Sequence, residues 1–567
     1  MNLGRIGAKN DRTDRSGVYT LGDSLNYKKK TDSLEHYVWR KNYGSFFNIN
    51  KPKPVYGDNG YKLYIADGST PTNAYIRQYE LSVPYDPDTA SYSGNQLAVQ
   101  YVDTELGCSF SYDGTIMYLF GASNPGSHHP PTTYDLSTAW DITTAVPRVK
   151  TLYPGTNSTT GIYVSPDGTR LYICGSSVDA VDQYDIATAW DIGTSSYVRR
   201  FSVSAQETNP QGVEFKPDGT KMYVCGSTGD DVNEYSLSTA WDISTASFVQ
   251  SFSVSAQETV PTGVRFKSDG TRMYVCGSAG DDVNEYSLST AWDVSTASYV
   301  QRFLFSSYEN TVEGVAFNAD GTKMYACGTA NDGIVEYSLS TAWDVSTASF
   351  VHNTERLVEN INDVFVGGSD NYLFTYSNYH DVLFQYTMKT PGSTSQLDGV
   401  LQAVTTATES YERIAFTQVS PDGTTFLACY GTPSYLVKYS LSTPFELHTA
   451  TYDSLVNLSS LSGESLIWNG SLSEDGKDFY FVGNNTRAIY KVSFSTPWDI
   501  TGASIKMQRV NLYSSNNNSN ADYETLTTPL YYGAGAVSAI EGIAVSKDRS
   551  FMFITSNVGF HLYKMLT

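Results

Sequence analysis

One segment of this chain repeats almost unchanged at a shift of 51 residues. The stretch GVEFKPDGTKMYVCGSTGDDVNEYSLSTAWDISTASFVQ begins at Gly212, and GVRFKSDGTRMYVCGSAGDDVNEYSLSTAWDVSTASYVQ begins at Gly263. A repeat of this length predicts a repeat architecture instead of several unrelated domains. The same spacing separates the Asp residues that open four Asp-Gly-Thr turns, and weaker copies bring the candidate units to ten: Asp58, Asp113, Asp167, Asp218, Asp269, Asp320, Asp370, Asp422, Asp475 and Asp548.

Within one unit, apolar and polar residues alternate with a period of two, which is the strand signature. The unit around Asp218 predicts four strands, at 212–215, 221–225, 232–236 and 248–254. Four-stranded antiparallel units in tandem are typical of propeller blades, because each sheet buries its faces against its neighbours. We therefore expect an all-β fold in which residues 35–567 form a single large β-propeller. Ten blades are favoured, with eight or nine as the alternative.

The two ends of the chain predict how the ring closes. The last unit ends in a third strand near Phe560 and has no fourth strand after it. The segment HYVWR from His36 is similar to SYVRR from Ser196, which forms a fourth strand of the repeat. We expect residues near Tyr37 to complete the last blade and to cover an edge that would otherwise invite aggregation.

Two recurring residue types are predicted to be structural. Thr-Ala-Trp-Asp or Thr-Pro-Trp-Asp recurs in six units, and a ligand site would not need a copy in each. Trp is expected to pack the turn between third and fourth strands, while Asp accepts hydrogen bonds from turn amides. Five of the six cysteines occupy equivalent second strands, which are too far apart for disulfides, so buried thiols are expected. No CxxC is present, and we expect no metal and no cofactor.

The alternation of strands sorts the loops onto two rims. One rim carries the uniform Asp-Gly-Thr and Trp-Asp turns. The other collects variable, acidic and long loops, where a rigid frame usually carries function. The candidate ligand-binding residues lie there, with a simple solvated rim as the alternative: His128, His129, Asp230, Asp231, Asp281, Asp282, Tyr523, Tyr531 and Tyr532. Polar and tyrosine-rich loops suit the recognition of glycan or protein.

Charge is distributed unevenly along the chain. The net charge is −22, which argues against nucleic acid as a partner of the body. Residues 1–34 are basic by contrast and form a predicted docking arm, with a solvated leader as the alternative; its candidate contact residues are Arg5, Arg12, Arg15, Tyr19, Lys28, Lys29 and Lys30. No apolar run reaches the length of a membrane span, and the first residues lack the apolar region of a signal peptide.

Two resemblances add to this interpretation. The Pro-Asp-Gly-Thr turns and Tyr-Val strands resemble the propeller repeats of YVTN and SMP-30-like proteins, which implies a fold but no activity. The phrase Ser16-Gly17-Val18-Tyr19-Thr20-Leu21, followed by Tyr27 and a basic cluster, resembles the leader of structural proteins from tailed bacteriophages. That resemblance implies an arm that docks on other virion proteins within a larger assembly.

The sequence leaves two function classes open. In the first, the chain is a non-enzymatic virion protein of the tail fibre, head fibre or decoration type. It would be made in the host cytoplasm, and its rim would recognise a host surface glycan or a neighbouring subunit. In the second, it is a glycan-degrading or lactonase-like enzyme. No nucleophile elbow, P-loop or HExxH motif is found, so the first class is favoured.

Overall fold

A computed structural model describes the chain between residues 36 and 566. It leaves out 1–35, 43–52, 69–73, 100–106, 121–131, 153–158, 401–413, 512–539 and 546–550, together with gaps of up to four residues elsewhere. The docking arm predicted at 1–34 lies outside the described residues.

The described residues form ten four-stranded sheets, and their strand pairs are antiparallel. The unit around Asp218 has β15 (Pro210–Phe215), β16 (Lys221–Gly226), β17 (Asp231–Leu237) and β18 (Ala246–Ser253). These bounds agree within about two residues with the strands predicted from the alternation. The predicted blade-like unit is therefore confirmed.

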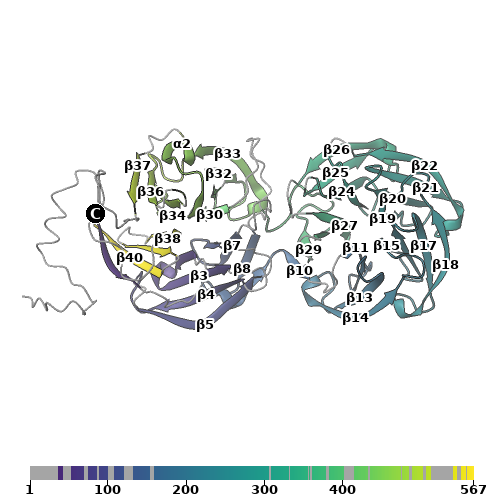
Figure 1. Cartoon of the computed structure of the whole chain (residues 1–567), viewed down its shortest axis with the longest axis horizontal. Coiled ribbons are helices and arrows are strands. Elements are labelled where there is room, and N and C mark those ends of the chain that lie inside the picture. Colours follow the sequence, from purple (N-terminus) through teal and green to yellow (C-terminus); the bar gives the residue numbers. More distant parts are fainter. Residues whose placement is uncertain are drawn as a thin grey trace, which may run out of the picture.

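Five sheets form what we call the central ring, which Figure 1 shows in teal. Their first strands contact one another in the order β11, β15, β19, β23 and β27, and β27 contacts β11 again. Besides β15 to β18, the strands are β10 (Lys150–Leu152), β27 (Ile361–Gly367), β28 (Tyr372–Ser377), β29 (Val382–Thr387); β11 (Thr159–Val164), β12 (Arg170–Gly175), β13 (Ala180–Ile186), β14 (Ser195–Ser202); β19 (Pro261–Phe266), β20 (Arg272–Gly277), β21 (Asp282–Leu288), β22 (Ala297–Leu304); β23 (Val312–Phe317), β24 (Lys323–Gly328), β25 (Ile334–Leu339) and β26 (Ala348–Asn353).

The other five sheets form the terminal ring, built from both ends of the chain (Figure 1). Here the first strands contact one another in the order β2, β6, β30, β34 and β38, and β38 contacts β2. The strands are β1 (His36–Asn42), β38 (Ile540–Val545), β39 (Phe551–Ser556), β40 (Gly559–Leu566); β2 (Lys53–Gly57), β3 (Lys62–Gly68), β4 (Ala74–Leu81), β5 (Ala90–Val99); β6 (Gly107–Phe110), β7 (Ile116–Phe120), β8 (Thr132–Leu136), β9 (Ala145–Pro147); β30 (Ile414–Val419), β31 (Thr425–Tyr430), β32 (Tyr435–Leu441), β33 (Ala450–Asn457); β34 (Ile467–Leu472), β35 (Asp478–Gly483), β36 (Ala488–Ser493) and β37 (Lys506–Asn511).

The prediction of one ring of ten sheets is therefore wrong. The sheets pack in two circuits of five, each with the arrangement of a β-propeller, and the central ring is an insertion between β9 and β30 of the terminal ring. The repeat describes how each unit folds, but it does not say which sheets become neighbours.

Each circuit has one sheet completed by a strand from elsewhere in the sequence. β1 pairs with β40, with Tyr37 opposite Met565, so the predicted pairing of the two chain ends is confirmed. In the central ring β10 plays the same part: Lys150 lies opposite Gln385 of β29. This second closure could not be predicted from the sequence, because β10 has only three residues and no clear copy of the fourth-strand pattern.

The hydrophobic core lies between neighbouring sheets. Between the sheets of β12 and β16, for example, Tyr172 and Cys174 pack with Val213, Phe215 and Val224, all of them fully buried. All six cysteines are free and buried, which confirms the prediction made for the five on second strands. Burial raises the pKa of the Cys174 and Cys276 thiols to about 12, so both stay protonated at neutral pH.

The Trp-Asp turns have the predicted structural role. The backbone of Trp241 is left-handed (φ 67°), and its N–H donates to the Gly219 carbonyl at 2.9 Å. The indole lies over Gly219, where a Cβ atom would come within 2.4 Å of it. Asp242 accepts from the Ser244 N–H, and the Tyr172 hydroxyl of the preceding sheet donates to the Trp241 carbonyl. The turn thereby joins two adjacent sheets. In six units a short 3-10 turn follows at this point, between the third and fourth strands. These turns are η3 (Ile142–Thr144), η4 (Ile192–Thr194), η5 (Ile243–Thr245), η6 (Val294–Thr296), η7 (Val345–Thr347) and η8 (Leu447–Thr449).

Helix is a minor part of the described chain. The α-helix α2 (Leu458–Ser462) and the 3-10 turn η1 (Asp58–Gly60) complete the helical elements used here. Among the described residues, no helix has the length and apolar character needed to cross a bilayer.

Candidate functional site

Equivalent residues of the first strands surround the centre of each ring. We call them axial residues. An axial residue is the first-strand residue that lies opposite a fixed position of the second strand, as Glu214 lies opposite Tyr223 and Arg265 opposite Tyr274. The axial residues of the terminal ring line a cavity of about 140 Å³. They are Val55, Ser109, Gln418, Ser471 and Ala544 in the terminal ring, and Tyr163, Glu214, Arg265, Ala316 and Phe365 in the central ring.

Neutral polar side chains hold the wall of the cavity together. The hydroxyls of Ser109 and Thr417 lie 2.9 Å apart and join β6 to β30. The Asn469 side-chain oxygen accepts from the Ile543 N–H at 3.0 Å and joins β34 to β38. Gln418 donates to a carbonyl of β6 at 3.3 Å. These bonds fix the orientation of hydroxyl and amide groups around the cavity.

Aromatic rings form much of the remaining lining. Trp140 and Trp498 belong to Trp-Asp turns, Tyr85 replaces Trp in the first unit, and Tyr112 precedes an Asp-Gly turn. All four line the cavity, so it lies toward the rim of uniform turns. Tyr112 is half exposed and half buried against this wall. The rim that the sequence marks as structural therefore borders the cavity.

The cavity lining is electrically neutral. Among the residues that the structure describes, none of those lining the cavity is Asp, Glu, Lys, Arg or His, although the chain carries a net charge of −22. Burial raises the pKa of the Cys108 thiol to about 12, so this residue is neutral as well. Hydroxyls, amides and aromatic faces can hydrogen-bond and stack against an uncharged polar molecule. They offer no pair of carboxylates for general acid and base catalysis.

The centre of the central ring is filled by a buried ion pair. Arg265 donates to both oxygens of Asp363, at 2.8 and 3.0 Å, and their side chains are 6% and 2% exposed. Asp363 also accepts from the N–H groups of Ile162 and Val364. The strands pack closely here, since a Cβ atom on Gly161 would lie 2.7 Å from a carbonyl oxygen of the next strand, β15. The two rings thus have different centres, one hollow and one closed.

Glu214 lies beside this pair and is the basis of a first testable prediction. Its carboxyl is 3.8 Å from Arg265, whose charge Asp363 already balances. Burial raises the pKa of Glu214 to about 8. The unfolded chain releases this proton near pH 4 to 5, so between about pH 5 and 8 the folded state binds more protons. Folding stability therefore falls as pH rises through this range, by up to about 1.4 kcal/mol per pH unit, because the folded chain must then hold a buried charged Glu214 or keep its proton.

We expect Glu214→Gln to remove this pH dependence. In urea unfolding, the variant should be more stable than the unmodified chain by on the order of 2 kcal/mol near pH 8.5 and similar to it near pH 5. Replacement of the exposed Glu80 by Gln is the control and should leave the pH profile unchanged. Parallel profiles for the Glu214→Gln variant and the unmodified chain would contradict the assignment.

The predicted acidic rim residues lie where second strands connect to third strands: Asp230 and Asp281 directly precede β17 and β21, and Asp231 and Asp282 are the first residues of these strands. Asp230 and Asp281 occupy left-handed turn positions (φ 49° each). The carboxylates of Asp231 and Asp282 accept from the neighbouring Asn233 and Asn284 amides at 2.6 Å, and burial raises the pKa of both. Among the described residues these aspartates belong to no cluster of three or more ligand atoms. Their contacts stabilise the loops, and ligand binding by this rim stays a prediction.

The remaining candidates lie outside the described part of the chain. They are His128, His129, Tyr523, Tyr531 and Tyr532 of the rim and Arg5, Arg12, Arg15, Tyr19, Lys28, Lys29 and Lys30 of the arm.

The sequence analysis missed the axial residues, although a signal for them existed. In the two nearly identical units, Glu214 in the first corresponds to Arg265 in the second. A reversal of charge within an otherwise unchanged strand indicates that the two residues make different contacts. The neutral cavity had a weaker signal, since Ser109, Gln418 and Ser471 are unremarkable until their strands are placed around one centre.

Comparison with known proteins gives similarity in shape alone. No family model matches the chain, and no curated protein matches it. Solved structures that match include the β-propeller domain of Myceliophteria thermophila Cps50 (Swd1), with 12% identity, TM-score 0.28, and coverage of 63% of this chain and 100% of that one. Kuenenia stuttgartiensis hydrazine synthase matches with 15% identity, TM-score 0.28, and coverage of 73% and 97%. A functionally unknown protein from Desulfotomaculum acetoxidans matches with 15% identity, TM-score 0.27, and coverage of 53% and 89%.

Proposed function

We propose that this chain is a non-enzymatic recognition protein of a bacteriophage particle, built as two five-bladed propellers, one inserted in the other. The terminal ring binds an uncharged polar ligand, such as a sugar unit of a host surface glycan. The observation that carries this proposal is the neutral cavity, in which hydroxyl, amide and aromatic groups surround one ring centre. Such a lining matches the alternating polar and apolar faces of a sugar.

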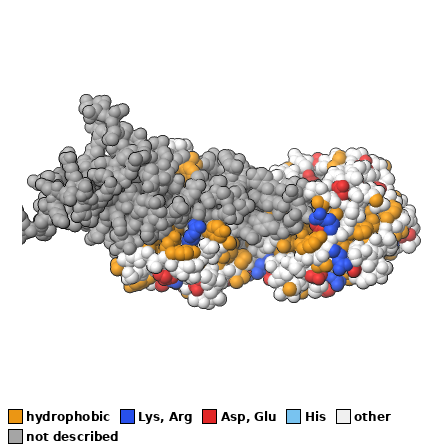
Figure 2. Space-filling model, turned by 60° about the horizontal axis from the view of Figure 1, so that its bottom comes forward, with side chains coloured by type: hydrophobic (Ala, Val, Ile, Leu, Met, Phe, Trp, Pro, Cys, Tyr) orange, Lys and Arg blue, Asp and Glu red, His pale blue; other side chains and the backbone are white. Residues whose placement is uncertain are grey.

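Attachment to a particle is supported by the arm and by the outer strands. The arm combines a basic composition with the leader resemblance described above. On the central ring, four successive outer strands expose an aromatic residue. These aromatic residues, each 40% or more exposed, are Tyr197, Phe248, Tyr299 and Phe350. The part of this ring visible in Figure 2 shows hydrophobic side chains interspersed with Lys, Arg, Asp and Glu. Repeated exposed aromatic residues suit contact with neighbouring subunits.

Tryptophan fluorescence tests the proposed binding, because Trp140 and Trp498 line the cavity. A panel of neutral mono- and oligosaccharides added to the full chain should include a member that changes the emission saturably. Gln418→Leu should weaken its binding at least tenfold, since the cavity loses an amide that can bond to the ligand (about 1.4 kcal/mol or more).

Tyr197→Ala is the matched control, because it removes an exposed aromatic residue of the central ring. It should leave sugar binding unchanged. Equal loss in both variants, or no binding by any sugar in the panel, would contradict the proposal. Release of reducing ends during the titration would instead favour the enzyme class.

A further inference from the structure

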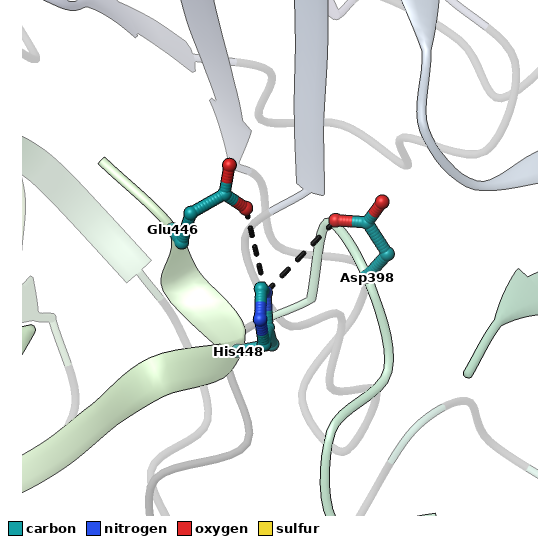
Figure 3. A group of neighbouring side chains, drawn as sticks. All are labelled: Asp398, Glu446 and His448. Carbon is teal, nitrogen blue, oxygen red and sulfur yellow. Dashed lines mark ion pairs between the residues drawn. The ribbon is translucent and has the colours of Figure 1, made fainter. Parts of the chain in front are cut away.

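Three potential metal ligands meet where the two rings join (Figure 3). Asp398 belongs to the segment after β29, whose backbone bonds back onto that strand and whose Leu397 and Val400 pack in the core of the central ring. Glu446 and His448 flank the start of η8 in the terminal ring. The three residues thus come from both rings, and their side chains point toward one another (Figure 3).

The spacing of the ligand atoms suits a single metal ion. His448 Nδ1 lies 3.4 Å from Glu446 Oε2 and 3.9 Å from Asp398 Oδ1, and the three ligand atoms lie within 4.8 Å of one another. Ligands held about 2 Å from a tetrahedral ion are roughly 3.3 Å apart, which is close to the shorter distance. The Asp398 oxygen lies farther from His448 than the Glu446 oxygen does, so binding of an ion requires Asp398 to move toward the other two ligand atoms.

The imidazole supplies an independent observation. The His448 side chain is 8% exposed, and its Nδ1 atom has no hydrogen-bond partner. A buried polar atom without a partner costs about 1 to 3 kcal/mol, so such atoms need an explanation. A nitrogen lone pair facing two carboxylate oxygens is satisfied by a cation between them.

Arg148 contacts the same two oxygens. Its Nη1 atom is 2.6 Å from Glu446 Oε2 and 3.4 Å from Asp398 Oδ1. Its other nitrogens are anchored on both oxygens of Asp135, at 2.9 and 3.0 Å. Because the guanidinium is rigid and planar, Nη1 leaves the carboxylates only when they or the whole guanidinium move. Arg148 holds the carboxylates together and competes with a metal ion for them.

We propose that Asp398, Glu446 and His448 bind one divalent transition-metal ion of the Zn²⁺ class. One nitrogen and two oxygen ligands suit Zn²⁺ and Co²⁺, with a further position open to water. Because the ligands come from both rings, the bound ion fixes one ring against the other. Arg148 sets the affinity by competing for the carboxylates.

Cobalt titration of the full, chelator-treated chain tests this site, because Co²⁺ absorbs visible light when bound by protein ligands. We expect one equivalent of Co²⁺ to bind and Zn²⁺ to displace it. His448→Gln and Asp398→Asn should each weaken binding at least tenfold. Arg148→Gln should strengthen it at least tenfold, because the competing cation is gone. Unfolding midpoints in chelator show that each variant is folded.

The matched control is the double variant His128→Gln, His129→Gln, which removes the adjacent His pair of the sequence. It should bind the metal as the unmodified chain does. Loss of binding in this variant alone, unchanged binding in a folded His448→Gln variant, or no binding by either the unmodified chain or Arg148→Gln would overturn the proposal.

Discussion

Replacing Arg265 by leucine is expected to lower the free energy of unfolding by about 3 to 5 kcal/mol. The substitution leaves the Asp363 carboxylate, which is 2% exposed, without its cation. It also removes the bonds from the guanidinium to the carbonyls of Val264 and Val364. A buried charge without a partner is among the costliest defects in a core, because water no longer solvates it. Urea unfolding near pH 7 measures the change.

Two further variants separate the buried charge from lost packing. In Arg265→Leu combined with Asp363→Asn, no unpaired charge remains, and the Asn oxygen keeps one of the two backbone bonds. This double variant should recover at least a third of the loss. Arg199→Leu removes a second Arg–Asp ion pair, between Arg199 and Asp242. The side chains of this pair are 37% and 29% exposed. This substitution should cost less than about 1 kcal/mol. Equal losses for Arg265→Leu and Arg199→Leu would show that burial of the central pair is unimportant.

Local structure was predicted well from the sequence because the same pattern of strands and turns recurs in ten units. Each unit encodes its strands by alternation, its first turn by Asp-Gly-Thr and its second by Trp-Asp, and all of these depend on residues close in sequence. The pairing of Tyr37 with Met565 was predictable for another reason: a strand pattern was missing at one end of the chain and present at the other.

The arrangement of the sheets depends on information that the repeat does not carry. Neighbouring sheets pack through similar Val, Tyr and Cys side chains in both rings, so a ring of ten and two rings of five satisfy the same pattern. The unit at Asp370 did differ, since Gly392 takes the place of Trp in its turn. That departure lies in the sheet that β10 completes, but the sequence alone does not show that this sheet packs against the sheet of β11.

The candidate sites could not be predicted from the sequence for a related reason. The cavity lining comes from all five first strands of the terminal ring, which are up to about 490 positions apart in the chain. Asp398 and His448 likewise meet across two rings. The loops chosen from the sequence were chosen for variability and charge, whereas the cavity is built from small uncharged residues on strands.

Deleting residues 1–42 is expected to destabilise the terminal ring and to leave the central ring folded. The deletion removes β1, which pairs with β40 from His36 opposite Leu566 to Asn42 opposite His561. Each net backbone bond contributes about 0.5 to 1.5 kcal/mol, so the loss should be on the order of 3 kcal/mol or more. The uncovered edge of β40 can then pair with another copy of the chain. The central ring has its own closing strand, β10, on β29, and does not depend on β1.

Hydrogen exchange measured separately for the two rings distinguishes this result from general unfolding. Peptides covering 559–566 should lose protection in the deletion variant, whereas peptides covering β15 to β22 should keep it, and light scattering should show association. The matched control is deletion of 1–34, which removes the basic arm and keeps His36–Asn42. It should leave exchange and mass unchanged. If deletion of 1–42 exposed both rings together, the two circuits of five sheets would be one cooperative unit, and the independence that two separate closing strands provide would be lost.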